Sequence, residues 1–422
     1  MNIENAVIRY LGYAKNIALI KRDILVNHNP SFITAIIGPR RAGKTLFMIQ
    51  LIKELSVPES NKIFVNGEDI DFEGITVKDL DMVENMINKI YQVDASKPIW
   101  LFIDEVQRFP SWSKWVRTLK DENKYNIVIS GSTSELSTEK IPSELRGRAL
   151  NTLVLPFSFE EVLDANDMTY GKYFDSLKIG ELTRKFDEFL KYGGYPQVVL
   201  EKNIKLKTKI LGELLETVMQ RDILEKRHIR NSRPLRAFIN AAIGSACRQI
   251  SYVSLSNWLN SNGLSMARQT AINYLSYAEE VFLFFQIFPF SYKPKMRNVN
   301  PKLYLSDSGL LGLISEDKSK QLENQVLIEL LRRDKKVNYY LDKNSEVDFV
   351  VRDKKVLELI QVSLSMAEPI TYARETEAMI HASEKLKCDN LTIITENEEK
   401  ALRSDGKTIK VIPAWKWFLA AD

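Results

Sequence analysis

One short run of residues constrains this chain more than any other feature. Residues 38–45 read Gly-Pro-Arg-Arg-Ala-Gly-Lys-Thr, which is the pattern G-x-x-x-x-G-K-T. An apolar, β-branched run at 32–37 precedes it, and a helical apolar pattern at 46–55 follows it. Glycines let the backbone N–H groups of such a loop surround phosphate oxygens, and the helix N-terminus adds its dipole. The run therefore predicts a phosphate-binding loop (P-loop) in an α/β fold with a parallel sheet.

Two side chains of the loop have expected roles in nucleotide binding. We expect Lys44 to reach the β- and γ-phosphates, and the Thr45 hydroxyl to hold Mg²⁺. The expected nucleotide-binding residues are Gly38, Pro39, Arg40, Arg41, Ala42, Gly43, Lys44, Thr45 and Leu46. No N-K-x-D guanine-reading motif follows, which favours ATP with Mg²⁺ as the cofactors.

Two further apolar runs end in polar residues that suit the same site. Residues 99–103 are followed by Asp104 and Glu105, as a Walker B strand requires. We expect Asp104 to bind Mg²⁺ through a water molecule and Glu105 to polarise the attacking water. Residues 126–130 form another expected strand, after which Ser132 is a candidate sensor of the γ-phosphate. A plain polar turn is the alternative for Ser132.

A fourth strand is expected at 149–155, directly after Arg146 and Arg148. Either arginine would stabilise transition-state charge, from its own chain or from a neighbouring subunit of a homo-oligomer. A solvated basic loop is the alternative. Together with a strand at 63–65, these runs predict a parallel sheet of about five strands. The strand at 63–65 lies between the P-loop and the acidic pair along the chain. This order of elements favours an ATPase over a small GTPase.

Composition excludes several other classes of protein. The chain has 422 residues and a formal net charge of +4, too mild to indicate a nucleic-acid partner by itself. Two cysteines and three histidines provide neither a disulfide framework nor a Cys/His zinc site. The apolar run at 281–292 is shorter than the about 20 residues that span a bilayer. Without a visible secretory signal, we expect a cytoplasmic protein with no membrane partner.

The region after the sheet predicts a winged helix. Leu255 and Leu259 mark one amphipathic helix, and a turn at 262–263 leads into a second helix whose buried face carries Ile272 and Leu275. A basic hairpin follows, between expected strands at 281–288 and 304–306. The candidate DNA contacts are Arg268, Gln269, Asn273, Lys293 and Lys295. Contact with a protein partner is the alternative, since many winged helices serve only that purpose.

The last region alternates helix and strand in the order of a restriction-endonuclease-like core. Glu323 begins a helix, and Asp348 lies on the first strand of a hairpin. In active nucleases the second strand of this hairpin ends in E-x-K, and the corresponding positions here are Gln361 and Ser363. A neutral amide binds Mg²⁺ more weakly than a carboxylate, and serine supplies no cation. We therefore expect a degenerate nuclease site with poor activity or none. A shifted register that uses Glu358 is the alternative, and Glu323 and Asp348 remain for a weak metal site or for structural hydrogen bonds.

Over nearly its whole length the chain resembles archaeal and bacterial P-loop ATPases of the AAA superfamily that carry a C-terminal domain of unknown function. The residues that carry the resemblance are GPRRAGKT, LFIDEVQ, SGSTSEL, LRGRA, LPFSF, YGGYP, PKLYLSDSGLL, LENQVLIEL and EVDFVV. The resemblance implies an ATPase core, a winged helix and a nuclease-like tail. The expected domains are a P-loop core at 1–160, a helical lid at 161–235, a winged helix at 236–312 and the tail at 313–422.

These features lead to one expected function and two alternatives. The first is an ATP-hydrolysing switch or motor that acts on DNA. The second is a signalling or defence regulator whose C-terminal domains bind protein partners, and the third is a nucleotide-binding scaffold with negligible turnover. DNA binding separates the first from the others, because phosphate contacts make binding salt-dependent.

Overall fold

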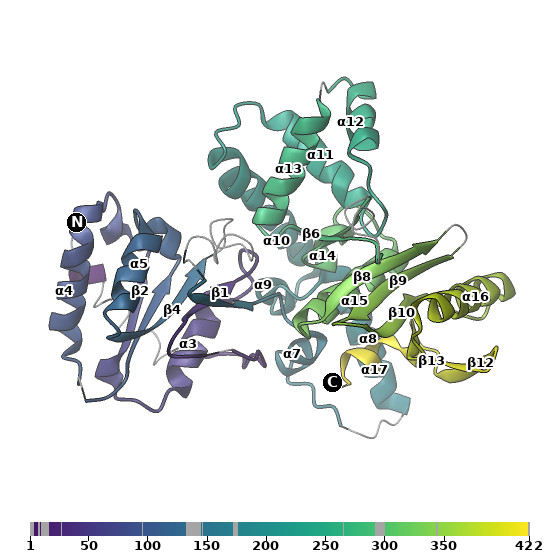
Figure 1. Cartoon of the computed structure of the whole chain (residues 1–422), viewed down its shortest axis with the longest axis horizontal. Coiled ribbons are helices and arrows are strands. Elements are labelled where there is room, and N and C mark those ends of the chain that lie inside the picture. The colour runs from purple at the N-terminus through teal and green to yellow at the C-terminus, as the bar shows by residue number, and fades with distance from the viewer. Residues whose placement is uncertain are drawn as a thin grey trace. The chain divides into compact units, whose positions relative to one another are not determined.

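The computed structural model describes residues 4–6, 9, 17–26, 28–94, 96–131, 145, 147–171, 176–264, 266–291, 300–342 and 345–420. The chain divides into two compact units (Figure 1). Unit 1 is residues 1–154 with 280–282, and unit 2 is residues 155–279 with 283–422.

Unit 1 is built on a five-stranded sheet in the order β2-β3-β4-β1-β5. All neighbouring strands are parallel, which confirms the predicted sheet. The strands are β1 (Ile33–Ile37), β2 (Lys62–Asn66), β3 (Ile99–Asp104), β4 (Tyr125–Gly131) and β5 (Ala149–Leu153). Strand β4 lies between the P-loop strand β1 and the acidic strand β3, an order that the sequence did not predict. Parallel strands end at the same edge, so the P-loop and the acidic pair share that edge.

Helices cover both faces of this sheet. Crossovers between parallel strands are right-handed, so the direction in which the chain moves along the sheet decides which face a helix covers. The chain moves one way from β1 to β2 and the other way from β2 through β3 to β4. Helix α3 therefore covers one face, and α4 and α5 cover the other (Figure 1). Apolar residues of α3, among them Phe47 and Ile52, pack on Phe64, Phe102 and Val128 of the sheet. The helices are α3 (Lys44–Glu54), α4 (Leu80–Tyr91) and α5 (Trp112–Asp121), with 3₁₀ turns η1 (Glu59–Asn61), η2 (Ile70–Phe72), η3 (Val77–Asp79) and η4 (Val106–Arg108).

Unit 2 begins with helices and a short hairpin. The helices are α7 (Phe159–Asp164), α8 (Ser176–Tyr192), α9 (Pro196–Val199), α10 (Ile204–Thr217), the π-helix η6 (Val218–Glu225), α11 (Ser232–Gly244), α12 (Tyr252–Ser261), α13 (Arg268–Glu280) and α14 (Ser308–Gly312). Strands β6 (Phe284–Ile287) and β7 (Lys302–Leu305) pair antiparallel. The expected helices and hairpin are present, but β7 begins at Lys302 rather than Tyr304, which brings a lysine into the strand.

The rest of unit 2 is a mixed six-stranded sheet in the order β12-β13-β11-β10-β9-β8. Helix α16 packs on β9 and β10, while α15 contacts β7, β8 and β10. The elements are α15 (Lys318–Arg332), β8 (Lys336–Asp342), β9 (Ser345–Arg352), β10 (Val356–Val362), α16 (Pro369–Leu386), β11 (Leu391–Thr395), β12 (Lys400–Ser404), β13 (Lys407–Pro413) and α17 (Ala414–Phe418). In the described part of the chain, no helix has the length and apolarity to cross a membrane.

A buried carboxylate joins the helical part of unit 2 to β7. Asp307, two residues after the end of β7, accepts the Gly309 N–H with Oδ1 at 2.8 Å and the Gly194 N–H with Oδ2 at 2.7 Å. Gly193 has a φ of 75°, and a Cβ there would lie 1.6 Å from Asp307 Oδ1. The paired glycines of YGGYP therefore allow the end of α8 to approach this carboxylate, which gives that motif a structural role.

The contact between Asp307 and the paired glycines predicts opposite effects of two glycine substitutions on the free energy of unfolding. Gly193→Ala should destabilise unit 2 by more than about 2 kcal/mol, because the methyl group overlaps Asp307 and the backbone is left-handed. Gly180→Ala, within α8 and facing open space, is the control and should stabilise by about 0.5–1 kcal/mol. Urea unfolding measures both effects. Equal shifts for the two variants would contradict the account.

Candidate functional site

The P-loop occupies the edge of the unit 1 sheet where β1 ends. Gly38 has a φ of 145°, and a Cβ there would lie 2.1 Å from the Val154 carbonyl oxygen, so no side chain fits. Gly43, with a φ of 97°, is the N-cap of α3. The buried Lys44 ammonium donates to the carbonyl oxygens of Gly38 at 3.1 Å and Pro39 at 2.9 Å. The loop thus curls around its own lysine and presents the N-terminus of α3.

The acidic strand end lies directly beside this loop. Asp104 is 1% exposed, and its Oδ2 accepts the Thr45 hydroxyl at 2.6 Å. Its Oδ1 accepts the Ser130 hydroxyl, and Ser130 Oγ in turn accepts the Glu105 N–H at 3.2 Å. Burial and the charge of Glu105 raise the pKa of Asp104, against these hydrogen bonds and the Lys44 charge. A bound cation would offset that cost.

The side chains at this end of the sheet have the chemistry to bind a magnesium–nucleotide complex. A hydroxyl and a carboxylate in mutual contact are hard oxygen ligands of the kind that Mg²⁺ prefers. The N-terminus of α3, which directly follows the P-loop, adds backbone N–H groups and a dipole that favour bound phosphate. Glu105 lies next in the chain with a φ of 48°, and its carboxylate accepts a hydrogen bond from the Gln107 amide. The side chain of Leu46 is 38% exposed on the first turn of α3.

The sequence prediction for Arg148 is wrong in one respect. The Arg148 carbonyl accepts the Ile33 N–H at 2.7 Å, where β1 begins, and its guanidinium pairs with Asp121 at the end of α5. Because the P-loop follows the other end of β1, Arg148 lies at the opposite edge of the sheet and does not reach the P-loop of its own chain. A role from a neighbouring subunit stays a prediction. Ser132 and Arg146 lie outside the described residues.

Two residues of unit 1 were missed by sequence reasoning. Ser130, inside β4, bonds to Asp104 in a position where we expected only an apolar strand. The buried Arg22 donates to the Ala42 carbonyl of the P-loop at 3.0 Å. Its backbone is held by the Gln50 side chain of α3 through bonds of 2.8 and 2.9 Å. Nothing in the local pattern around Arg22 indicates this long-range contact.

In unit 2, α13 exposes the residues that the sequence assigned to DNA. Arg268, Gln269 and Asn273 are exposed, and Gln269 donates to Asn273 at 3.1 Å. Leu275 is buried as expected, whereas Ile272 is only half-buried. Lys293 and Lys295 lie outside the described residues.

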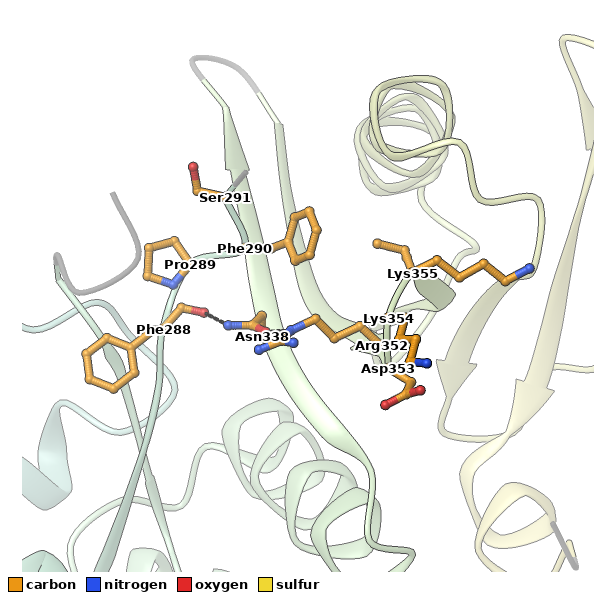
Figure 2. A pocket seen from close by; sticks show the side chains of 10 residues that line it. Phe288, Pro289, Phe290, Ser291, Asn338, Arg352, Asp353, Lys354 and Lys355 are labelled. Carbon is orange, nitrogen blue, oxygen red and sulfur yellow. Dashed lines mark hydrogen bonds between the residues drawn. The ribbon is translucent and has the colours of Figure 1, made fainter. Parts of the chain in front are cut away.

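A cavity of about 340 Å³ lies between the segment after β6 and the turn that joins β9 to β10 (Figure 2). At its floor, Arg352 donates to Asn338 Oδ1 at 2.6 Å, and Asn338 donates to the Phe288 carbonyl at 3.0 Å. The exposed Lys354 and Lys355 lie at its margin. Its lining is thus both aromatic and basic, and consists of Phe288, Pro289, Phe290, Ser291, Asn338, Arg352, Asp353, Lys354, Lys355 and Val356.

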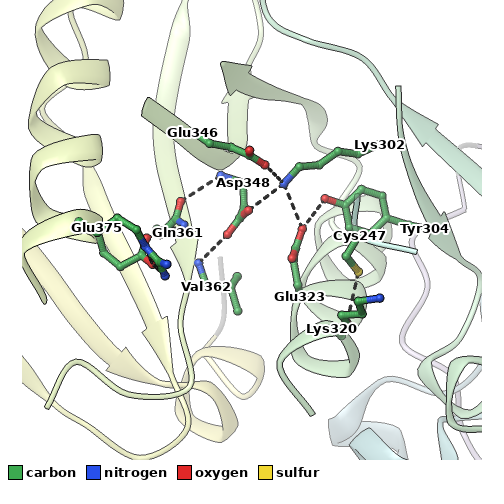
Figure 3. Close-up of polar contacts among 11 residues, drawn as sticks. Cys247, Lys302, Tyr304, Lys320, Glu323, Glu346, Asp348, Gln361, Val362 and Glu375 are labelled. Carbon is green, nitrogen blue, oxygen red and sulfur yellow. Dashed lines mark hydrogen bonds and ion pairs between the residues drawn. The ribbon is translucent and has the colours of Figure 1, made fainter. Parts of the chain in front are cut away.

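The expected nuclease residues meet a cation that the sequence did not predict. Lys302 of β7 is 3% exposed, and its Nζ lies 2.9 Å from Asp348, 3.4 Å from Glu323 and 2.6 Å from Glu346 (Figure 3). Burial lowers the pKa of Lys302, but the surrounding carboxylates outweigh it and raise that pKa above its usual value. Tyr304, two residues along β7, donates to Glu323 at 2.7 Å. We name these residues the Lys302 cluster.

Gln361 and Ser363 take structural roles beside this cluster. Gln361 accepts the Asp348 N–H at 3.1 Å and donates to Glu375 of α16 at 2.8 Å. The Ser363 hydroxyl donates to the Ser365 carbonyl at 3.0 Å. Among the residues that the structure describes, no three His, Cys, Asp or Glu side chains are grouped to hold a metal ion.

Comparison with known proteins gives the family. Residues 30–163 match a model described as an AAA domain, and residues 183–321 match a domain of unknown function. An uncharacterized protein of Methanocaldococcus jannaschii is 34% identical over 99% of this chain and 95% of its own length. An uncharacterized protein of Haemophilus influenzae is 27% identical over 92% of this chain and 94% of its own length.

Solved structures show more distant likenesses. A Walker-type ATPase of Pyrococcus abyssi aligns with a TM-score of 0.43 and 13% identity, over 68% of this chain and 91% of that one. The Orc1 protein of Aeropyrum pernix, in complex with DNA, aligns with a TM-score of 0.30 and 12% identity, over 75% of this chain and 91% of that one.

Two buried carboxyl groups of unit 2 predict a pH dependence. Burial raises the pKa of Asp307 to about 7, and burial with the charge of Asp348 raises the pKa of Glu323 to about 8. Groups that bind a proton more tightly when folded stabilise the fold at low pH and lose that contribution as pH rises. The free energy of unfolding should therefore fall between about pH 5 and 8, and Glu323→Gln should flatten the fall. Urea unfolding across this range checks it, and parallel profiles for the two proteins would contradict it.

Proposed function

Because the chain belongs to the family of its full-length Methanocaldococcus jannaschii relative and carries an AAA-type P-loop ATPase domain, we propose that it couples ATP hydrolysis to action on DNA. The observation that carries the ATPase part is the 2.6 Å contact between Thr45 and Asp104 beside the P-loop. It sets a hydroxyl beside a carboxylate, the pair of oxygen ligands that a magnesium ion at this loop would need.

The residues of unit 1 have distinct tasks in this proposal. Lys44 exchanges its bonds to the P-loop carbonyls for bonds to the β- and γ-phosphates. Thr45 and Asp104 hold Mg²⁺, which neutralises phosphate charge when bound. Glu105 orients the attacking water and accepts its proton, once its carboxylate leaves the Gln107 amide. Ser130 fixes the rotamer of Asp104 and the backbone of Glu105.

This assignment predicts separable effects on binding and turnover. Glu105→Gln should keep nucleotide bound while turnover falls about 10²–10⁴-fold, because the amide retains polarity and loses basicity. Lys44→Ala should weaken ATP binding itself. Glu122→Gln, exposed at the end of α5, is a matched control and should behave as the parent protein. Nucleotide binding and phosphate release measure the two effects. Parental turnover in Lys44→Ala would mean that the site is assigned wrongly.

Action on DNA is supported by the exposed polar face of α13 and by the basic stretch of sequence that follows it. An Arg–Gln–Asn face on the second helix of a helix–turn–helix suits contacts to base edges and phosphates. In the proposal this region is a winged helix, and the aromatic and basic cavity of Figure 2 extends the surface available to a nucleic-acid strand.

The DNA proposal predicts a change in affinity and in salt dependence. Replacing Arg268, Lys293 and Lys295 by Ala should weaken binding, and the slope of log K against log salt should become shallower by about 0.9 for each phosphate that the protein no longer neutralises. The matched control replaces exposed Lys385, Arg403 and Lys410, which removes the same charge from other elements. Fluorescence anisotropy with duplex DNA at several salt concentrations measures both. Identical isotherms for the two triple variants would contradict the proposal.

A regulatory ATPase whose C-terminal domains bind a protein partner is the second candidate. It is favoured by the exposed Val253 and Trp258 of α12, which are 45% and 53% exposed. Exposed aromatic and aliphatic side chains on one helix suit a protein contact better than a phosphate contact.

The tail does not cleave DNA in this proposal. Gln361 stands where a second carboxylate is needed, and its amide is already bonded to Asp348 and Glu375. Ser363 supplies no cation for the attacking water. Linear, single-stranded and branched DNA should therefore remain intact in Mg²⁺ and in Mn²⁺.

A further inference from the structure

We propose that Lys302 closes a divalent-cation site in unit 2: its ammonium stands where Glu323 and Asp348 would otherwise hold Mg²⁺ or Mn²⁺. The proposal goes beyond ATP hydrolysis and action on DNA, and it holds whether or not either is correct.

The first argument is the placement of the charge. One ammonium faces three carboxylates, at 2.6, 2.9 and 3.4 Å, and Asp348 and Glu323 among them are largely buried. Carboxylate oxygens around a buried positive charge are the environment of a hard divalent cation. Mg²⁺ binds oxygen at about 2.0–2.1 Å, so the Asp348 and Glu323 oxygens, now 2.9 and 3.4 Å from the ammonium, would have to close in by about an ångström. With Lys302 in place they are held apart.

The second argument is that hydrogen bonds already fix the orientation of the Asp348 and Glu323 carboxylates around Lys302. Asp348 Oδ2 accepts the Val362 N–H at 3.1 Å, which leaves Oδ1 directed at Lys302. Glu323 Oε1 is fixed by the Tyr304 hydroxyl. Orientation of ligand oxygens by such outer hydrogen bonds is typical of metal sites.

The third argument is that β7 holds the Lys302 ammonium in position. Lys302 and Tyr304 are two residues apart on β7 and therefore share a face, and both reach Glu323 (Figure 3). The far end of the same segment is fixed by Asp307 through its bonds to Gly194 and Gly309. A cation tethered at both ends of its strand cannot diffuse away, unlike a bound metal. The cluster thereby keeps a positive charge among its carboxylates without any metal in solution.

A different explanation makes Lys302 the missing lysine of a working nuclease. In that case the wild-type protein would bind a divalent cation through Asp348 and cleave DNA with it. The two explanations therefore predict opposite metal binding by the wild-type protein.

The test measures Mn²⁺ binding by electron paramagnetic resonance on the full-length, nucleotide-free protein. We expect Lys302→Met to bind one more Mn²⁺ per chain than the wild-type protein, and the double variant Lys302→Met/Asp348→Asn to lose that ion. Lys302→Arg, which keeps the positive charge, should bind as the wild-type protein does. Any Mn²⁺ held at Thr45 and Asp104 is common to all four proteins and cancels in the comparison.

Two results would overturn the proposal. One is equal Mn²⁺ binding by Lys302→Met and the wild-type protein. The other is a wild-type Mn²⁺ site that Asp348→Asn removes, which would favour the nuclease explanation.

Poor folding of Lys302→Met does not remove the test. In that case Mn²⁺ present during refolding should restore soluble protein, and the triple variant Lys302→Met/Glu323→Gln/Asp348→Asn should fold without metal. Failure of the metal to rescue Lys302→Met, or failure of the triple variant to fold, would mean that Lys302 acts through packing, and the proposal would be wrong.

Discussion

Unit 2 depends on partners for two ionisable groups that are buried on β7 or just after it, Lys302 and Asp307. Removing one partner of a buried ion pair typically costs about 3–5 kcal/mol, because the remaining charge is left without compensation. Lys302 meets this constraint by contacting carboxylates from α15 and β9, and Asp307 meets it by accepting backbone N–H groups from the segment between α8 and α9 and from α14. One short segment therefore connects the helical part, the hairpin and the six-stranded sheet, which together form a single compact unit.

Unit 1 also buries charged groups, and they lie beside the loop that we expect to bind a nucleotide. Asp104 is buried beside Glu105, and the hydroxyl groups of Thr45 and Ser130 donate to its oxygens. The buried Lys44 ammonium donates to carbonyl oxygens of the P-loop. Both groups would gain a stronger partner in a magnesium–nucleotide complex.

Local patterns were sufficient to predict most of the fold. The parallel sheet and the consecutive helices α12 and α13 followed from apolar periodicity and from the P-loop, because both patterns depend on residues close in sequence. The order of the strands was not predicted, since it depends on elements far apart in the chain. The contacts of Arg22, Ser130 and Lys302 did not follow, since each depends on the pairing of elements far apart in the chain. Lys302 was missed for a further reason. Its strand was predicted to begin at Tyr304, and a lysine outside a strand gives no signal of burial.

The measurement that tests the central claim most directly is the steady-state rate of ATP hydrolysis by the full-length protein in Mg²⁺, with and without DNA. Single-stranded, duplex and branched DNA are compared at equal nucleotide concentration. The account predicts measurable hydrolysis by the protein alone and a higher rate with at least one form of DNA. A rate that no form of DNA changes would contradict coupling to DNA, and the absence of hydrolysis under all conditions would contradict the ATPase itself.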